Sequence, residues 1–337
     1  MTQIAKNPYN YCMDFLKGLA CIFVVFIHVK FPGIFGQAVQ AVARFAVPFF
    51  FMVSGYFYYR PNYQGVIGGG KKILHILKIF FFAYLFYIIV AIIENLFLGG
   101  TNSFDFSLKH ILWVVTIYML PSNVPGQLWF LLSLLEVYII WFIIDYYHQR
   151  KLAYILASLS LIAMILLGQG AWLAGHPLES YYYRNTWTEG FFFFTLGYFL
   201  HDKQKKLTIG NTALILIILF SALLSIVERF VCGRVFAVHL NTFPLVIGLF
   251  IYSINNSEKH VGLVQRIGKK YSNYVYILHM FWWHYFDKIM KFVCLQDNTL
   301  VSWLRPIIVL GLTIFTSMGC YFLFNHEKSE NSLRKAL

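Results

Sequence analysis

The chain has 337 residues, of which 59% are hydrophobic, 20% are aromatic and only 12% are charged, whereas soluble domains carry about a quarter of their residues as charged side chains. Together with a mean hydropathy of +0.64, this excludes an ordinary soluble enzyme and predicts a polytopic membrane protein. The formal net charge of +13 is not read as a nucleic-acid site, because no basic block with interleaved aromatic residues lies outside the apolar segments.

Ten apolar segments are long enough to cross a bilayer as helices, which takes roughly 20 residues each. In chain order they cover residues 11–29, 38–58, 73–98, 126–147, 152–172, 185–201, 211–230, 234–254, 271–294 and 302–324. A further apolar stretch at 110–120 is short and precedes two prolines, which leaves an interfacial helix and an eleventh span as alternatives. We predict an all-α, polytopic membrane helix bundle with ten transmembrane helices, forming a single domain over residues 1–337.

The basic residues orient these spans, because cytoplasmic loops are enriched in Lys and Arg. With ten spans and both termini in the cytoplasm, sixteen basic residues fall in inner segments and only six in outer ones. The outer six are Lys30, Lys109, Arg184, Arg229, Arg234 and Lys291. If residues 110–120 also crossed, every later loop would change sides and the asymmetry would largely cancel. The sequence therefore favours ten spans with cytoplasmic N- and C-termini.

The cysteines predict neither a disulfide framework nor a metal site. They are odd in number, none belongs to a CxxC pair, and four of the five lie within or beside apolar runs. The five are Cys12, Cys21, Cys232, Cys294 and Cys320. Such residues act as small buried hydrophobic side chains.

The first apolar segment carries three ionisable residues, which are costly inside a bilayer and indicate function by default. Lys17 and His28 are eleven residues apart, which is about three helical turns, so they share a face with a rise of about 16 Å between them. Asp14, three residues before Lys17, lies on the same stripe. The alternative is that Asp14 and Lys17 extend to the inner surface while His28 only ends the span.

Five short motifs in order along nearly the whole chain resemble acyltransferase family 3, the integral-membrane acyltransferases of bacterial surface glycans. They are Lys17 and His28 with ten residues between them, Arg44-Phe-Ala-Val-Pro48 through Ser54-Gly55-Tyr56, Gly126-Gln-Leu-Trp129, Arg184-Asn185 through Glu189-Gly190 with Leu196-Gly197-Tyr198, and Tyr276-Ile-Leu-His279. The family usually has Arg where this chain has Lys17, so the bidentate guanidinium is replaced by a point charge.

The resemblance implies transfer of an acyl group, most often acetyl, from cytoplasmic acyl-CoA to a hydroxyl of an extracytoplasmic surface glycan or lipid-linked saccharide. It implies a multi-pass protein of the bacterial inner membrane, in contact with lipid, with no tightly bound cofactor and with a homo-oligomer left open. Two other functions remain as alternatives: an exporter of polysaccharide or lipid-linked glycan, and a non-catalytic anchor or sensor. Transporters often contain internal repeats with broken spans, which are not found here. An anchor does not explain ionisable residues at membrane depth.

Under this reading His28, near the outer surface, is the general base or the covalent acyl carrier. Glu189 is expected about one turn below the same surface, where a carboxylate could fix the imidazole tautomer. A buried structural carboxylate, paired with Arg184 or with backbone groups, is the alternative for Glu189. Lys17 and Asp14 complete the predicted catalytic set.

Residues Arg60 to Lys72 are the expected donor site. The segment nearly spells a phosphate-binding loop, but Lys72 stands where Ser or Thr would bind magnesium and a helix precedes it, so nucleotide hydrolysis is rejected. Successive glycine amides beside Arg60, Lys71 and Lys72 could instead bind the phosphates of coenzyme A, with a flexible cytoplasmic connection as the alternative. Arg44 and His279 are further donor-side candidates, placed within spans, with structural pairing as an alternative for Arg44.

The acceptor-side candidates are Trp129, Arg184 and Asn185. A tryptophan ring can stack on a sugar, although tryptophans near a membrane interface are also common anchors. The other two belong to the motif that leads into Glu189.

Overall fold

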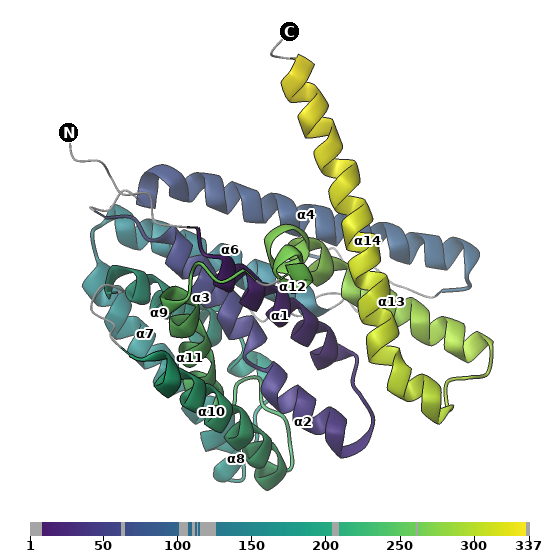
Figure 1. The fold of residues 1–337 in the computed structure, drawn as a ribbon, viewed down its shortest axis with the longest axis horizontal. Coiled ribbons are helices and arrows are strands. Elements are labelled where there is room, and N and C mark those ends of the chain that lie inside the picture. The colour runs from purple at the N-terminus through teal and green to yellow at the C-terminus, as the bar shows by residue number, and fades with distance from the viewer. Residues whose placement is uncertain are drawn as a thin grey trace. The chain divides into compact units, whose positions relative to one another are not determined.

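The computed structural model describes residues 9–61, 65–100, 107–109, 112, 114, 126–203, 209–260 and 262–334. Over these residues the chain is helical and contains no β-strand. The chain divides into two compact units, whose helices are labelled in Figure 1. The first comprises Met1–Ala46, Ile209–Val235 and His239–Leu337, and the second comprises Val47–Thr208 and Phe236–Val238.

The first unit is built around α1 (Tyr11–His28). Its other elements are α2 (Gly33–Ala43), α10 (Asn211–Cys232), α11 (Thr242–Asn255), α12 (Gly262–Arg266), η7 (Ile267–Tyr271), α13 (Ser272–Phe292) and α14 (Thr299–Arg334). Asn10 caps the start of α1, because its side-chain oxygen accepts a hydrogen bond of 2.7 Å from the backbone amide of Met13. α1 packs against α2, α11, α12, η7, α13 and α14. α13 and α14 form a helical hairpin and lie side by side in Figure 1.

The second unit contains α3 and the long helix α4. Its elements are α3 (Ala46–Tyr58), α4 (Gly65–Phe97), η2 (Gly126–Leu128), α6 (Trp129–Tyr146), α7 (Arg150–Ile165), η3 (Leu166–Gly170), α8 (Ala171–Leu173), η4 (Ser180–Tyr182), η5 (Thr186–Gly190) and α9 (Phe191–Lys203). Two glycines bring α3 and α9 together: a Cβ atom on Gly55 or Gly197 would lie 1.9 Å from a carbonyl oxygen of the facing helix. Such an approach is open only to glycine.

Among the described residues there are three five-residue turns of π-helix: η3 and η7 lie within helical runs, and η5 starts the run that continues as α9. π-Helical turns are rare and occur frequently at functional sites, because they displace side chains from the regular helical stripe. The turn η5 contains Glu189, and η7 lies against α1 beside Asp14.

Seven helices of the described residues are long and apolar enough to cross a membrane. They are Tyr11–His28, Gly33–Tyr58, Gly68–Phe97, Gly126–Tyr146, Arg150–Leu173, Asn211–Cys232 and Thr299–Phe324. The predicted spans at 185–201, 234–254 and 271–294 coincide with α9, α11 and α13, which are helical but shorter or more polar. The all-helical membrane bundle is thus supported, whereas the count of ten and the side of the termini stay predictions. The stretch 110–120 lies almost entirely outside the described residues.

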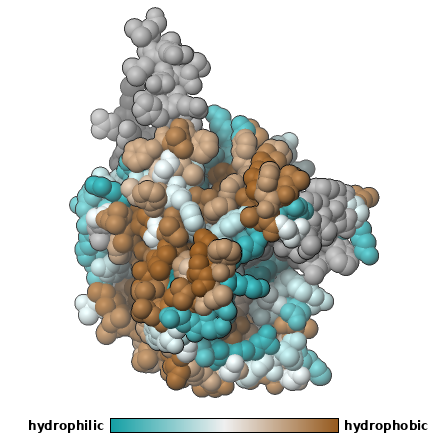
Figure 2. All heavy atoms as spheres, turned by 90° about the vertical axis from the view of Figure 1, so that its right-hand side faces the viewer, coloured by the Kyte–Doolittle hydropathy of each residue, from teal (hydrophilic) through white to brown (hydrophobic). Residues whose placement is uncertain are grey.

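The described surface is rich in large apolar side chains. Leu216, Leu219 and Phe220 on α10 are each more than 60% exposed, and Phe315 on α14 is 76% exposed. Figure 2 shows hydrophobic side chains in broad patches on the face that it draws. A water-exposed protein rarely presents such surfaces, but a bilayer covers them, provided that the backbone hydrogen bonds are satisfied within helices.

Candidate functional site

In the first unit, α1 runs alongside the consecutive segments α12, η7 and α13. A Cβ atom on Gly18 would lie 1.9 Å from the carbonyl oxygen of Val264, and one on Gly268 would lie 1.9 Å from that of Asp14. Further along, Cys21 is near the carbonyl oxygen of Ser272, and the ring of His28 is near that of His279. From Gly18 through Cys21 to His28, the partners advance from Val264 through Ser272 to His279, so the two segments run parallel.

Asp14 and Lys17 form an ion pair near the start of α1, with 3.1 Å between Lys17 Nζ and Asp14 Oδ1. The hydroxyl of Tyr9 donates a hydrogen bond to the other oxygen of Asp14. Lys269 of η7 lies over the ring of Tyr9, 4.4 Å from its centroid. Two effects raise the pKa of Tyr9 above its usual range: partial burial contributes most, and the hydrogen bond to Asp14 comes second. This end of α1 therefore gathers one carboxylate and two ammonium groups.

The imidazole of His28 lies at the last residue of α1, next to the imidazole of His279 on α13. Their ring centroids are 5.2 Å apart, and the ring of Trp283 lies 6.4 Å from that of His28. His28 is half-buried, whereas His279 is completely buried. The histidine of the first motif, His28, and the histidine of the last motif, His279, thus lie next to each other.

The tautomer of His279 follows from its hydrogen bond. Its Nδ1 lies 3.1 Å from the carbonyl oxygen of Val275, and a carbonyl can only accept, so Nδ1 carries the proton and the lone pair of the neutral ring is on Nε2. Nε2 is buried and has no hydrogen-bond partner among the described residues. A buried basic nitrogen without such a partner is uncommon, and it occurs here beside the predicted catalytic histidine.

His279 lies deeper along its helix than the sequence suggests. The apolar pattern places it about two turns into a span that starts at residue 271, but the helical run begins at Gly262. His279 is seventeen residues beyond Gly262, just as His28 is seventeen residues beyond Tyr11. The pattern misses the start because Arg266, Lys269 and Lys270 interrupt it there. The contact of His279 with the donor stays a prediction.

Arg44 lies in the two-residue turn that joins α2 and α3 within the membrane-length stretch Gly33–Tyr58. α2 ends at Ala43 and α3 begins at Ala46, so Arg44 is the C-terminal cap residue of α2 and is half-buried. Pro48 favours this turn, since proline is accommodated in the first turn of a helix but not in its interior. Its donor-side role stays a prediction.

In the second unit, two of the acceptor-side residues meet. The guanidinium of Arg184 lies over the ring of Trp129, 5.1 Å from its centroid, in cation–π geometry. Asn185 follows Arg184 but acts locally, because its side-chain oxygen accepts hydrogen bonds from the backbone amides of Trp187 and Thr188 and so caps η5. Its amide nitrogen donates to the carbonyl of Tyr181. The geometry therefore favours a structural role for Asn185.

Glu189 is the fourth residue of η5 and is 1% exposed. The same turn holds a polar network that the sequence does not reveal as a unit. Thr186 donates a hydrogen bond of 2.5 Å to the carboxylate of Glu136 and lies 3.1 Å from the hydroxyl of Ser133, both on α6. The sequence predicts for Glu136 either a helix–helix hydrogen bond or a place in a cavity. It does not predict Thr186 as the partner, because the two residues are far apart in the chain and follow no motif.

Two of the expected donor-binding cations close the end of α3. Arg60 donates hydrogen bonds to the carbonyls of Phe57 and Tyr59, at 3.1 and 2.7 Å, and Lys72 donates to Phe57 at 2.5 Å. Basic side chains commonly satisfy the last carbonyl groups of a helix in this way. Lys71 is exposed.

The glycine-rich segment differs from the expected loop, because Gly65 to Gly70 form the first turns of α4. A Cβ atom on Gly69 would lie 2.8 Å from Phe142 and 2.9 Å from the hydroxyl of Tyr58. This glycine therefore serves close packing, and its amide belongs to a helix rather than to a phosphate cradle. The expectation of successive glycine amides around a ligand was wrong for Gly69 and Gly70.

The cations near α3 belong to a larger polar cluster. Asp145, at the end of α6, is completely buried and pairs with Arg150 at 3.0 Å, while the hydroxyl of Tyr198 lies 3.2 Å away. Arg150 also donates to the carbonyl of Arg60 at 2.8 Å. A carboxylate near the end of an apolar segment is expected to be solvated, but Asp145 is instead enclosed by Tyr198 of α9 and by Arg150.

The structure thus brings together Asp14 with Lys17, His28 with His279, and Trp129 with Arg184. The predicted pairing of Glu189 with His28 joins residues of two different units and stays a prediction. Over the described residues, no group of three or more His, Cys, Asp or Glu side chains is placed to hold a metal ion.

Comparison with known proteins adds one finding. The sequence model of acyltransferase family 3, described as an acyltransferase domain, matches residues 10–324, which includes most of both units. No curated protein and no solved structure matches the chain.

Proposed function

Because the chain belongs to acyltransferase family 3, we propose that it is a membrane O-acyltransferase that moves an acetyl group from cytoplasmic acetyl-CoA to a hydroxyl of an extracytoplasmic surface carbohydrate. The acceptor is a glycan or a lipid-linked saccharide, and the protein resides in a bacterial inner membrane. Family membership supports the acyl transfer in general, and the long apolar helices support the membrane location.

The observation that carries the proposal is the pair formed by His28 and His279. Acyl transfer to a hydroxyl needs a group that removes the hydroxyl proton or carries the acyl group. His28 is accessible enough to meet a substrate, and the buried ring of His279, 5.2 Å away, limits the orientations open to it. Among the described residues of α1, His28 is the only imidazole.

The reaction balances with His28 as general base. The imidazole takes the proton of the sugar hydroxyl while the oxygen attacks the thioester carbonyl. The tetrahedral intermediate then expels coenzyme A as the thiolate, which recovers the proton, so an ester and a free thiol are formed. With His28 as covalent carrier, its imidazole attacks the thioester and expels coenzyme A as the thiolate. The sugar hydroxyl then attacks the acyl-imidazole, which frees His28, and the hydroxyl proton passes to the thiolate. Glu189 would offset the imidazolium in either route.

The donor side of the proposal rests on the cations near the predicted inner surface. Lys17 keeps 21% of its side chain exposed and has donors beyond the one used by Asp14. Arg60, Lys71 and Lys72 lie around the junction of α3 and α4. Coenzyme A is polyanionic, so Lys17 in the first unit and these cations in the second would each favour its binding.

The test is acetyl transfer by membranes that contain the protein. With radiolabelled acetyl-CoA, the wild-type membranes should place base-labile label in the saccharide fraction, and His28→Ala should lower this by at least about a hundredfold. His75→Ala is the matched control, because His75 is an exposed imidazole on α4. Saccharide export without any acetyl incorporation in the wild type would instead support an exporter and overturn the proposal.

A further inference from the structure

α13 carries a stripe of residues that starts at His279 of the histidine pair and continues through three residues that the proposed chemistry does not use. His279, Trp283, Asp287 and Lys291 follow one another at intervals of four residues, which places them along one face of the helix. The stripe starts at the buried His279 and ends at the exposed Lys291. It therefore leads from the histidine pair to the surface.

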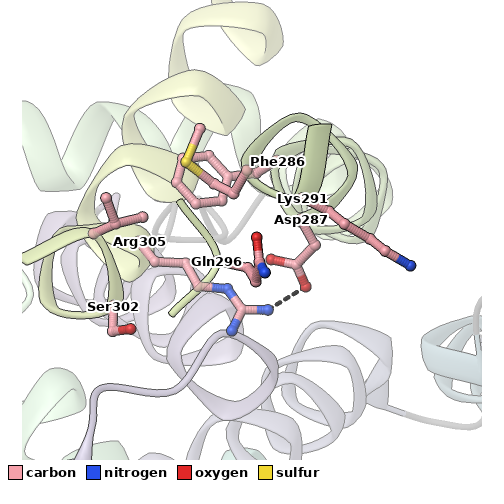
Figure 3. A pocket seen from close by; sticks show the side chains of 8 residues that line it. Phe286, Asp287, Lys291, Gln296, Ser302 and Arg305 are labelled. Atoms are coloured by element: carbon pink, nitrogen blue, oxygen red, sulfur yellow. Dashed lines mark hydrogen bonds and ion pairs between the residues drawn. The ribbon is translucent and has the colours of Figure 1, made fainter. Parts of the chain in front are cut away.

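A pocket of about 320 Å³ opens at the exposed end of this stripe, between α13 and α14. Its polar lining comes from Asp287, Lys291, Gln296, Ser302 and Arg305, and Phe286 supplies an aromatic wall (Figure 3). The volume is at the lower end of the range for small-molecule sites, roughly 300–1,000 Å³. The pocket is therefore large enough to hold one small polar unit of a ligand.

Two planar charged groups in the pocket are paired but remain accessible. Arg305 donates to the carboxylate of Asp287, as Figure 3 shows, and the two side chains keep 30% and 44% of their surface exposed. In the same view, Lys291 extends away from this pair. Carboxylate, guanidinium and amide groups together offer fixed donors and acceptors, which suits vicinal hydroxyl groups.

The pocket is connected to the histidine pair through one aromatic ring. The guanidinium of Arg305 lies 6.0 Å from the ring centroid of Trp283, and that ring lies 6.4 Å from the ring of His28. Under the predicted topology, Lys291 belongs to an outer segment. A ligand in the pocket would therefore approach His28 from the side on which the acceptor is expected.

We propose that the pocket between α13 and α14 binds a sugar unit of the acceptor, and that this sugar carries or adjoins a negatively charged group. Asp287, Arg305 and Gln296 would bind its hydroxyls. Lys291 would bind the anion, because the pocket is lined by two cations, Lys291 and Arg305, and by one carboxylate. The inference rests on the proposed function, because it assigns the acceptor of the same reaction.

The experiment compares transfer with hydrolysis in the same membranes supplied with radiolabelled acetyl-CoA. A weakened acceptor site leaves the acetyl group to water, so the ratio of saccharide-bound label to free acetate should fall. Lys291→Gln and Gln296→Ala should each lower this ratio by about tenfold, the size of one lost charge-assisted or polar contact. Lys291→Arg, which keeps the charge, should restore most of it.

Lys288→Gln is the matched control, because Lys288 is an exposed lysine of the same helix that does not line the pocket. A ratio within twofold of the wild type in both Lys291→Gln and Gln296→Ala would overturn the pocket assignment. A fall in Gln296→Ala alone would overturn the anionic acceptor. Absence of any label in saccharide with wild-type membranes would instead overturn the proposed function.

Discussion

The rings of His28 and His279 lie with centroids 5.2 Å apart, on the parallel helices α1 and α13. The partner that a substrate can reach is His28, because His279 is completely buried and uses Nδ1 to bind the carbonyl of Val275. His279 is therefore placed to position the ring of His28, which the proposed function takes as the reactive group. The nitrogen of His279 that remains for this support is Nε2.

If Nε2 of His279 is the atom that positions His28, His279→Gln should retain more transfer activity than His279→Asn. The glutamine amide can reach the place of Nε2, whereas the asparagine amide can only replace Nδ1 and its bond to Val275. We expect about a tenfold difference in transfer rate between the two variants. Initial rates with radiolabelled acetyl-CoA check this, with thermal unfolding in detergent as the control for folding. Equal rates would assign His279 a packing role only.

The close approach of α1 and η7 depends on Gly268. Gly268→Ala would place a methyl group 1.9 Å from the carbonyl oxygen of Asp14 in the present backbone, so one segment must move. Overpacking of this kind costs typically about 1–3 kcal/mol. Gly311→Ala on α14 is the control, because its Cβ would meet no atom within 4 Å. A lower unfolding temperature for Gly268→Ala than for the control is expected in detergent.

Lys17 can be tested through the affinity for the donor. Lys17→Arg should keep or lower the KM for acetyl-CoA, because a guanidinium binds phosphate in a bidentate manner. Lys17→Gln should raise that KM by about tenfold. The exposed Lys30, at the other end of α1, provides the control as Lys30→Gln. A loss of kcat without a change of KM would place Lys17 outside the donor site.

The pair of Asp145 and Arg150 should contribute strongly to stability. Asp145→Asn removes the charge that faces Arg150, whose side chain is only 14% exposed. Breaking a buried ion pair on one side typically costs about 3–5 kcal/mol, because the remaining charge stays desolvated. Glu258→Gln, at an exposed turn, should change the free energy of unfolding by less than about 0.5 kcal/mol. Chemical unfolding in detergent measures both, and similar values would contradict the prediction.

The topology predicts that Cys294 faces the outside. Cys294 is exposed at the end of α13, while Cys12 and Cys21 are buried. Cys232 also lies in an outer segment and is half-exposed, so the test uses a Cys232→Ser background. In that background a membrane-impermeant maleimide should modify intact cells at Cys294, and Cys294→Ser should abolish the labelling. Labelling of Cys294 only after permeabilisation would reverse the predicted orientation of the α13–α14 hairpin.

Much of the architecture could be read from periodicity and length. The apolar segments at 11–29 and 211–230 became α1 and α10 with ends shifted by at most two residues, and the segment at 73–98 became α4, which starts eight residues earlier. Helices in a bilayer satisfy their own backbone hydrogen bonds and need little help from distant residues. The shifts occur where charged residues or glycines start a helix, as at Gly65 and Gly262.

The sequence alone also determined that His28 ends the first span on the stripe of Lys17, since helical spacing is a local property. Which side chains meet across helices was decided only by the tertiary structure. Glycine contacts at Gly18 and Gly268 set the register between α1 and α13, and that register brings His279 to His28. Register depends on the packing of atoms far apart in the chain, and no local pattern of residues encodes it.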